Sequence, residues 1–425
     1  MNMERDILKK NSLKRDSLKI VGAWLLAASL AAVMTGIAAC SDESSASESE
    51  SAGVTNDIEY EVVSENSLSA AELIKSITGQ DMPLQAKVNY AVIKYASTYN
   101  GERVTLSGLV SYMDGLSALP CAVIGNHWTI ASNAECPSNA LSYDMALAIT
   151  QQALVVNADY MGYGVTSERT HPYLCADVCA EHSVDCFRAA MRYVADKGIK
   201  MAEGYKTYNI GYSQGGAVAL AVERYVESAD SDTQEMVRLE KTLCGAGPYD
   251  PAACYSVYVG QDPLKFPVAI PMIIMGMKDG CPEEMEGVSV EDYFSEPFLK
   301  AGVLDSIKSK RYTNTQINDL IERAVGGATV GSMMSVAALD STTALYSALH
   351  KALDKNDLTR GWTPKTRLQF FHSTQDDVVP YVNYENAAAN LSNENVEEAI
   401  VGDMGSHQDA AIIFYTKIIT GGINK

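Results

Sequence analysis

The segment 211–216 reads Gly-Tyr-Ser-Gln-Gly-Gly and places a serine, Ser213, among small residues. Residues 206–210 before it predict a short strand, and residues 214–226 after it predict a helix. In such a strand–turn–helix, small residues let the chain turn sharply enough to present the serine hydroxyl at the end of a sheet. The alternative interpretation is a glycine-rich loop that carries an ordinary surface serine.

A serine hydroxyl is a weak nucleophile at neutral pH, so it needs a histidine to take its proton and an acid to orient that histidine. In a site of this kind the chain order is serine, acid, histidine. Residues 367–371 predict a late strand, and the acid should follow it. Of the six histidines, only the last lies beyond this region: His127, His171, His182, His350, His372 and His407. His407 is therefore the predicted base, and the alternative is a solvated loop histidine.

Two adjacent aspartates compete for the role of the acid. Residues 372–380 read His-Ser-Thr-Gln-Asp-Asp-Val-Val-Pro. This run resembles the acid loop of many α/β-hydrolases, His-Gly-x-x-Asp-x-x-Val-Pro, in which the first aspartate orients the histidine. The resemblance selects Asp376. Asp377 is then expected to be a turn residue or an N-cap of a helix that starts near Tyr381.

Two further segments extend this resemblance. Residues 157–164 read Asn-Ala-Asp-Tyr-Met-Gly-Tyr-Gly, and residues 171–174 read His-Pro-Tyr-Leu. Together with the serine motif they resemble the secreted lipase and esterase branch of the α/β-hydrolases over about residues 85–420. The resemblance implies an α/β-hydrolase fold, no cofactor, and ester hydrolysis through three residues: Ser213, Asp376 and His407.

An acyl-transfer site also needs backbone N–H groups that stabilise the oxyanion. One is expected from Gln214, the residue after the serine, and the second from the loop that follows the strand 121–125. Relatives usually have His-Gly in that loop, whereas this chain has His127 and Trp128. The alternative is that these two residues only pack at the end of a strand.

The first 57 residues predict a lipoprotein export segment and a tether. Residues 20–39 carry no charge and end in Ile-Ala-Ala before Cys40, which resembles a bacterial lipobox. Cleavage there would leave Cys40 as a lipid-modified N-terminus. A transmembrane anchor or a plain secretory signal is the alternative. The acidic, serine-rich residues 40–57 then predict a disordered tether that either directs export to the cell surface or acts as a spacer.

The net charge restricts the partners. The chain carries −20, and loss of residues 1–39, with six basic and three acidic residues, changes this to −23. Such acidity argues against binding nucleic acid and favours a neutral or cationic substrate. The expected substrate is a small-molecule, glycan or lipid ester. The protein is also expected to bind the bacterial outer membrane through the lipid on its N-terminus.

Eight cysteines remain beyond Cys40. An even number outside the cytoplasm favours disulfides, and a bond between Cys121 and Cys136 would brace the loop that follows strand 121–125. The sequence has no Cys-x-x-Cys pair, so no metal site is expected.

Strand and helix patterns alternate along residues 58–425, which predicts an α/β fold with a mostly parallel sheet flanked by helices. Asn-Gly at 100–101 predicts a hairpin of residues 88–97 and 103–113. Further strands are expected at 120–125, 153–157, 206–210, 241–245, 267–275, 367–372 and 396–401, and helices at 177–197 and 381–392. Residues 281–362 are charged and helix-prone, and are expected to form a cap inserted into the hydrolase domain.

The sequence therefore predicts a serine esterase or lipase attached to the outside of a bacterial cell. A serine peptidase of the same fold is the main alternative, because acidic residues in the cap would bind a substrate's amino terminus: Glu283, Glu284, Glu286, Glu291 and Asp292. A binding lipoprotein that only retains the scaffold is the third hypothesis.

Overall fold

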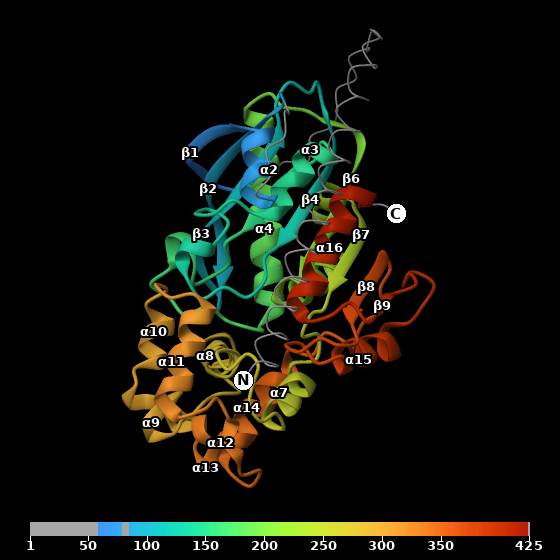
Figure 1. Cartoon of the computed structure of the whole chain (residues 1–425). Coiled ribbons are helices and arrows are strands. Elements are labelled where there is room, and N and C mark those ends of the chain that lie inside the picture. Colours follow the sequence, from blue (N-terminus) through green and yellow to red (C-terminus); the bar gives the residue numbers. More distant parts are fainter. Residues whose placement is uncertain (1–57, 79–84, 424–425) are drawn as a thin grey trace, which may run out of the picture.

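A mixed sheet forms the centre of the molecule (Figure 1). The structure, a computed structural model, describes residues 58–78 and 85–423. Within them nine strands follow the order β1-β2-β3-β5-β4-β6-β7-β8-β9. Their bounds are β1 (Tyr60–Ser69), β2 (Lys87–Tyr99), β3 (Glu102–Met113), β4 (Leu119–Asn126), β5 (Leu154–Ala158), β6 (Met201–Tyr212), β7 (Leu239–Gly245), β8 (Arg367–Ser373) and β9 (Ile400–Gly402). Along the sheet, the six neighbouring strands β5, β4, β6, β7, β8 and β9 all pair in parallel. The predicted mostly parallel sheet is therefore confirmed.

The first three strands form an antiparallel meander. The predicted hairpin is confirmed: Tyr99 pairs with Glu102, and the turn residues Asn100 and Gly101 both have positive φ, at 51° and 77°. These are the angles of the two-residue turns that match the twist of a hairpin. β1, which the sequence did not predict, pairs antiparallel with β2 and lies at the edge of the sheet.

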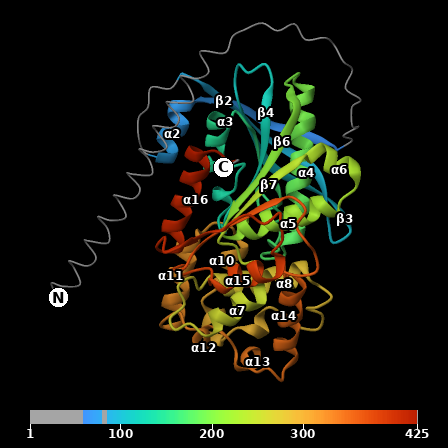
Figure 2. The same ribbon diagram turned by 90° about the vertical axis from the view of Figure 1, so that its right-hand side faces the viewer.

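Helices cover both faces of the sheet (Figure 2). One face packs against α4 (Ala176–Asp196) and α5 (Gln214–Ser228). The other packs against α2 (Ala70–Thr78), α3 (Leu147–Thr150) and α16 (His407–Gly421). The chain also forms α6 (Ser231–Val237) and α15 (Val382–Leu391). The helices predicted at 177–197 and 381–392 correspond to α4 and α15, so both predictions are confirmed.

A run of helices separates β7 from β8 and gathers below the sheet in Figure 1. We call residues 251–355 the helical insertion. It contains α7 (Pro251–Val259), α8 (Ala269–Gly280), α9 (Glu296–Lys300), α10 (Val303–Lys308), α11 (Asn314–Val325), α12 (Val330–Met333), α13 (Val336–Leu339) and α14 (Ala344–Lys355). Its buried side chains form an apolar cluster that also includes Ala131, Tyr173, Leu174 and Cys175. The helical insertion starts earlier than the cap predicted at 281–362.

The strand predicted at 267–275 is wrong, because these residues lie in the turn before α8 and in α8 itself. Every residue from Ala269 to Met277 is buried in the cluster of the helical insertion or against it. A helix that is buried on all sides has no polar face, so its sequence lacks the 3.6-residue period that distinguishes it from a buried strand.

The register of the sheet brings the candidate residues to one edge. Asn126 at the end of β4 pairs with Gly211 of β6, Tyr212 pairs with Gly245 of β7, and Gly245 pairs with Phe371 of β8. The carboxyl ends of these parallel strands are therefore adjacent. In open α/β sheets the loops that follow this edge hold the ligand.

The predicted export segment 1–39, the lipid-modified Cys40 and the tether 40–57 lie outside the described residues. Their assignment stays a prediction. Among residues 58–78 and 85–423, no helix is both long and apolar enough to cross a bilayer.

The buried carboxyl group of Asp144 is expected to affect the stability of the fold. Asp144 lies in the short helix η2 (Tyr143–Ala146) and is 4% exposed. Its Oδ2 accepts a hydrogen bond from Asn157 Nδ2 at 2.7 Å, whereas Oδ1 has no partner among the described residues. Burial raises the pKa of Asp144 from 3.8 to about 6.

We expect Asp144→Asn to remove a pH-dependent loss of stability. Because the pKa is raised in the folded state, the native protein loses folding free energy as the pH rises from 3.8 to about 6, and the loss persists above that. The shift corresponds to about 3 kcal/mol at 1.36 kcal/mol per pKa unit. Denaturant unfolding between pH 4 and pH 7 should show the variant gaining this amount relative to the native protein. The exposed Asp114→Asn control should show no such gain, and parallel pH profiles for Asp144→Asn would refute the expectation.

Candidate active site

Ser213 occupies a sharp turn between β6 and α5. Its φ and ψ are 60° and −128°, a backbone conformation that residues other than glycine rarely adopt. The turn is held by main-chain bonds: Ser213 N–H donates to Gly245 O at 2.9 Å, and Gly216 N–H donates to Ser213 O at 2.9 Å. Strained backbone of this kind is concentrated at functional sites. The surrounding structure therefore fixes the position of the serine.

The glycines of the motif are required by close backbone contacts. A Cβ on Gly211 would lie 1.9 Å from Gly215 O, one on Gly215 would lie 2.0 Å from Asn126 O, and one on Gly216 would lie 2.3 Å from Gly245 O. Each of these distances is far below a van der Waals contact, so a side chain at any of the three positions would force the strands and α5 apart. A loop with an ordinary surface serine does not have these constraints, and Ser213 is only 8% exposed.

His407 contacts Asp376 through its ring. His407 Nδ1 and Asp376 Oδ2 are 2.6 Å apart, and the carboxylate side chain is fully buried. Asp376 Oδ1 accepts the backbone N–H groups of Val378 and Val379, at 2.9 and 2.8 Å. These bonds fix the carboxylate, which in turn keeps the proton of the neutral imidazole on Nδ1. The other ring nitrogen, Nε2, is left as a base.

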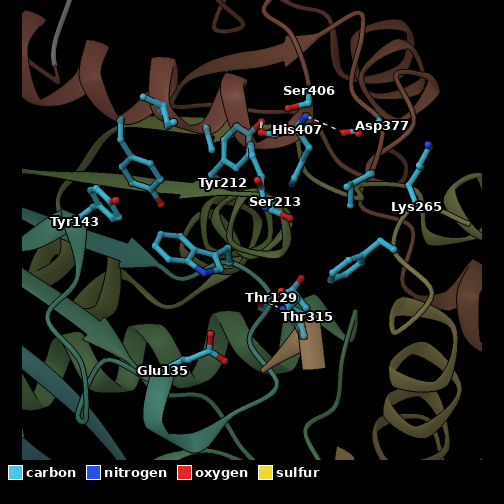
Figure 3. Close-up of a pocket in the computed structure, with 18 of the residues that line it drawn as sticks. Thr129, Glu135, Tyr143, Tyr212, Ser213, Lys265, Thr315, Asp377, Ser406 and His407 are labelled. Atoms are coloured by element: carbon cyan, nitrogen blue, oxygen red, sulfur yellow. Dashed lines mark hydrogen bonds between the residues drawn. The ribbon is translucent and has the colours of Figure 1, made fainter. Parts of the chain in front are cut away.

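Asp377 has a different place from its neighbour. Its Oδ1 accepts the backbone N–H of His407 at 3.1 Å, at the start of α16 (Figure 3). The sequence predicted the second aspartate as a turn residue or an N-cap before a helix near Tyr381. Asp377 does lie in a bend between β8 and α15, but α15 begins without a side-chain cap, and Asp377 contacts the start of α16. The two aspartates therefore hold the same histidine, one at the ring and the other at the backbone.

Ser213 and His407 face the same cavity, which has a volume of about 820 Å³ (Figure 3). Tyr212 supports His407: the two ring centroids are 4.9 Å apart, and the Tyr212 hydroxyl donates to His407 O at 2.8 Å. Apolar and aromatic side chains line one part of the cavity, namely Trp128, Tyr143, Ala411, Ile412, Tyr415 and Ile419. Polar side chains, most of them from α11 and the turn before it, line another part: Thr129, Lys265, Thr313, Asn314, Thr315 and Asn318.

The end of β4 and the residue after it lie close to the start of α5. Gln214 is the first residue of α5, and a Cβ on the next residue, Gly215, would lie 2.0 Å from Asn126 O and 2.9 Å from His127 O. Trp128 lines the cavity. The His127 ring lies away from it, stacked on Tyr160 with centroids 4.2 Å apart. The His127 side chain therefore packs, and any contribution to an oxyanion site would come from its backbone.

None of the described cysteines lines the cavity. All eight described cysteines are free, and Cys175 Sγ lies 3.8 Å from Cys281 Sγ. The predicted bond between Cys121 and Cys136 is wrong: Cys121 Sγ contacts Gln151 O, whereas Cys136 Sγ contacts Asn133 O. Cys121 lies within β4 and Cys136 beyond the loop that follows this strand, so their sulfurs have separate surroundings. Among the described residues, no group of three or more His, Cys, Asp or Glu side chains is placed to hold a metal ion.

No family model matches the chain, and no curated protein matches its sequence. Solved structures are similar to it. The rice cell wall degrading esterase LipA from Xanthomonas oryzae is 20% identical, with a TM-score of 0.68 over 85% of this chain and 96% of that chain. The closed state of Candida antarctica lipase A is 14% identical, with a TM-score of 0.56 over 85% of this chain and 82% of that one. With its mostly parallel sheet, flanking helices and strand–turn–helix around Ser213, the chain has the α/β-hydrolase fold of these proteins.

Proposed function

We propose that the protein is a serine hydrolase that cleaves carboxylic esters through Ser213, His407 and Asp376. The observation that carries the proposal is the 2.6 Å contact between His407 Nδ1 and the buried Asp376 Oδ2, on an imidazole that faces the same cavity as Ser213. A serine, a histidine and an acid in these relative places are the parts of a nucleophilic triad.

In the proposed reaction, Ser213 Oγ attacks the ester carbonyl while His407 Nε2 takes the hydroxyl proton. Asp376 stabilises the imidazolium that forms. The tetrahedral intermediate carries a negative oxygen, which the backbone N–H of Gln214 stabilises in this proposal. Its collapse breaks the bond to the alcohol, and the alcohol leaves with the proton from His407. Water then attacks the acyl-enzyme by the same route and releases the acid and free Ser213.

Two features favour an ester over a peptide substrate. The peptidase hypothesis depended on acidic cap residues, and none of them is among the described residues that line the cavity: Glu283, Glu284, Glu286, Glu291 and Asp292. Glu284 instead pairs with Lys355, with Oε1 and Nζ 2.9 Å apart. The structural similarity to an esterase and a lipase agrees with an ester substrate.

We expect the purified protein to hydrolyse a p-nitrophenyl ester at least about 100-fold faster than an aminoacyl-prolyl p-nitroanilide, measured as kcat/KM. A difference of this size corresponds to about 3 kcal/mol of transition-state stabilisation. Release of the same kind of coloured leaving group allows both rates to be followed by absorbance. Faster cleavage of the anilide would favour the peptidase, and failure to cleave either substrate would favour the binding protein.

A further inference from the structure

His171 is buried behind the serine turn and is not among the described residues that line the cavity. It is 3% exposed, and its ring bonds at both nitrogens. Nδ1 lies 2.8 Å from Met161 O, and Nε2 lies 2.6 Å from the side-chain Nε2 of Gln214. Gln214 is the residue whose backbone N–H is placed next to the nucleophile.

The two contacts define the protonation of the His171 ring. A carbonyl oxygen only accepts hydrogen bonds, so Nδ1 must carry the proton that is donated to Met161 O. Burial lowers the pKa of His171 well below 6.5, with a further contribution from the nearby Lys310 cation, so the ring is neutral. Nε2 therefore has a free lone pair and accepts a hydrogen bond from the Gln214 amide.

The Gln214 side chain depends on this bond for its position. Gln214 is 2% exposed, and its Oε1 has no hydrogen-bond partner among the described residues. The bond to His171 is thus the polar contact that anchors the amide. Because Gln214 is the first residue of α5, fixing its side chain also fixes the start of the helix, where the Gln214 backbone N–H has no partner within the helix.

His171 packs among residues of two sequence motifs, 157–164 and 171–174, that contribute no residue to the triad. The Tyr160 ring stacks on those of His127 and His171, with centroid distances of 4.2 and 6.1 Å and interplanar angles of 30° and 13°. Gly162 approaches the backbone of His171 so closely that a Cβ would lie 2.6 Å from His171 N. The segments 157–164 and 171–174 therefore form one buried support that ends at Gln214.

We propose that His171 is a positioning residue of the active site, which holds the Gln214 amide and thereby aligns the Gln214 backbone N–H with the developing oxyanion. This inference rests on the proposed function. It gives the Asp-Tyr-x-Gly and His-Pro-Tyr segments a shared role in catalysis, although no residue of either segment is among the described residues that line the cavity.

Two substitutions of His171 test its two hydrogen bonds one at a time. His171→Asn places an amide near the Nδ1 position, which keeps the bond to Met161 O and removes the acceptor for Gln214. His171→Gln reaches farther and retains an acceptor for Gln214. We expect kcat for a short p-nitrophenyl ester to fall about 10- to 100-fold in His171→Asn, with KM changed less than about threefold, because small misplacement of a catalytic group costs up to about 100-fold. His171→Gln should recover most of this loss.

A double-mutant cycle tests whether His171 acts through Gln214. Gln214→Leu keeps the backbone N–H and removes the amide, so it should lower kcat by a similar factor. If the two residues act as one unit, the double variant His171→Asn/Gln214→Leu should be no slower than the slower single variant. His182 is the matched control, since it is also buried in this region but bonds to Thr98 O. His182→Asn should reduce thermal stability and leave kcat within about twofold.

The outcomes distinguish this inference from the proposed function. If the native protein hydrolyses the ester but His171→Asn and Gln214→Leu each retain kcat, or their effects multiply, the positioning role is overturned. The same conclusion follows if kcat tracks melting temperature equally in the His171 and His182 variants. If His171→Asn does not fold, Gln214→Leu and His171→Gln decide the question. Absence of ester hydrolysis in the native protein would instead contradict the proposed function itself.

Discussion

Ser213→Ala is expected to lower kcat/KM for a short aryl ester by about 10⁴- to 10⁶-fold, the range found when the nucleophile of a triad is removed. Alanine lacks the hydroxyl that forms the acyl-enzyme, and His407 cannot replace it. The fold should survive, because the bonds that hold the turn involve the backbone of residue 213: its N–H to Gly245 O and its C=O to the N–H groups of Gly216 and Ala217. Melting temperature should therefore change little.

The measurement combines steady-state kinetics with labelling by a fluorophosphonate, which reacts with activated serines. The native protein should be labelled at Ser213 and the variant should not. Ser183→Ala is the matched control, since Ser183 is also buried. Its Oγ donates to Asn126 Oδ1, at the end of β4, at 3.1 Å. This control should cost about 1 kcal/mol of stability and keep ester hydrolysis within a few-fold. Undiminished turnover in Ser213→Ala would refute the proposed nucleophile, and an unlabelled native protein would revive the binding-protein hypothesis.

The serine turn could be predicted because its requirements are local in sequence. The strand, the turn and the helix occupy consecutive residues, and the contacts that exclude a Cβ at Gly211 and Gly216 involve backbone within about 35 residues. The order of serine, acid and histidine then left a single histidine, His407, and the structure brings it to Asp376. These residues meet because the ends of β6 and β8 flank β7 at one edge of the sheet.

The features that the sequence did not predict depend on contacts between distant segments. α8 resembles a strand in sequence because the rest of the helical insertion and residues 173–175 bury all its sides. β1 has charged residues along an exposed edge, and its pairing with β2 defines it. The bond between His171 and Gln214 joins positions 43 residues apart, so the two motifs could be identified but their contact could not. The sequence selected Asp376 as the acid, but the bond of Asp377 to the backbone of His407 became visible only with the position of α16.

Asp376→Asn is expected to lower kcat by about 10⁴-fold, the loss found when the acid of a triad becomes an amide. The reason lies in the hydrogen bonds of residue 376. The N–H groups of Val378 and Val379 need an acceptor, so the amide oxygen of asparagine must face them. Its NH₂ group then points at His407 Nδ1, which must accept this bond. The ring proton is displaced to Nε2, and His407 can no longer take a proton from Ser213.

Asp377→Asn is the matched control at the adjacent position. The amide oxygen can still accept the backbone N–H of His407, so the start of α16 should stay in place. Loss of a negative charge at a helix N-terminus costs about 0.3–1 kcal/mol, which would lower stability slightly and kcat less than about tenfold. Pre-steady-state kinetics should show that Asp376→Asn slows both acylation and deacylation, because His407 takes a proton in each step. If Asp377→Asn proves the slower variant, the ring contact at 2.6 Å is not the catalytic one, and the acid must be assigned to Asp377.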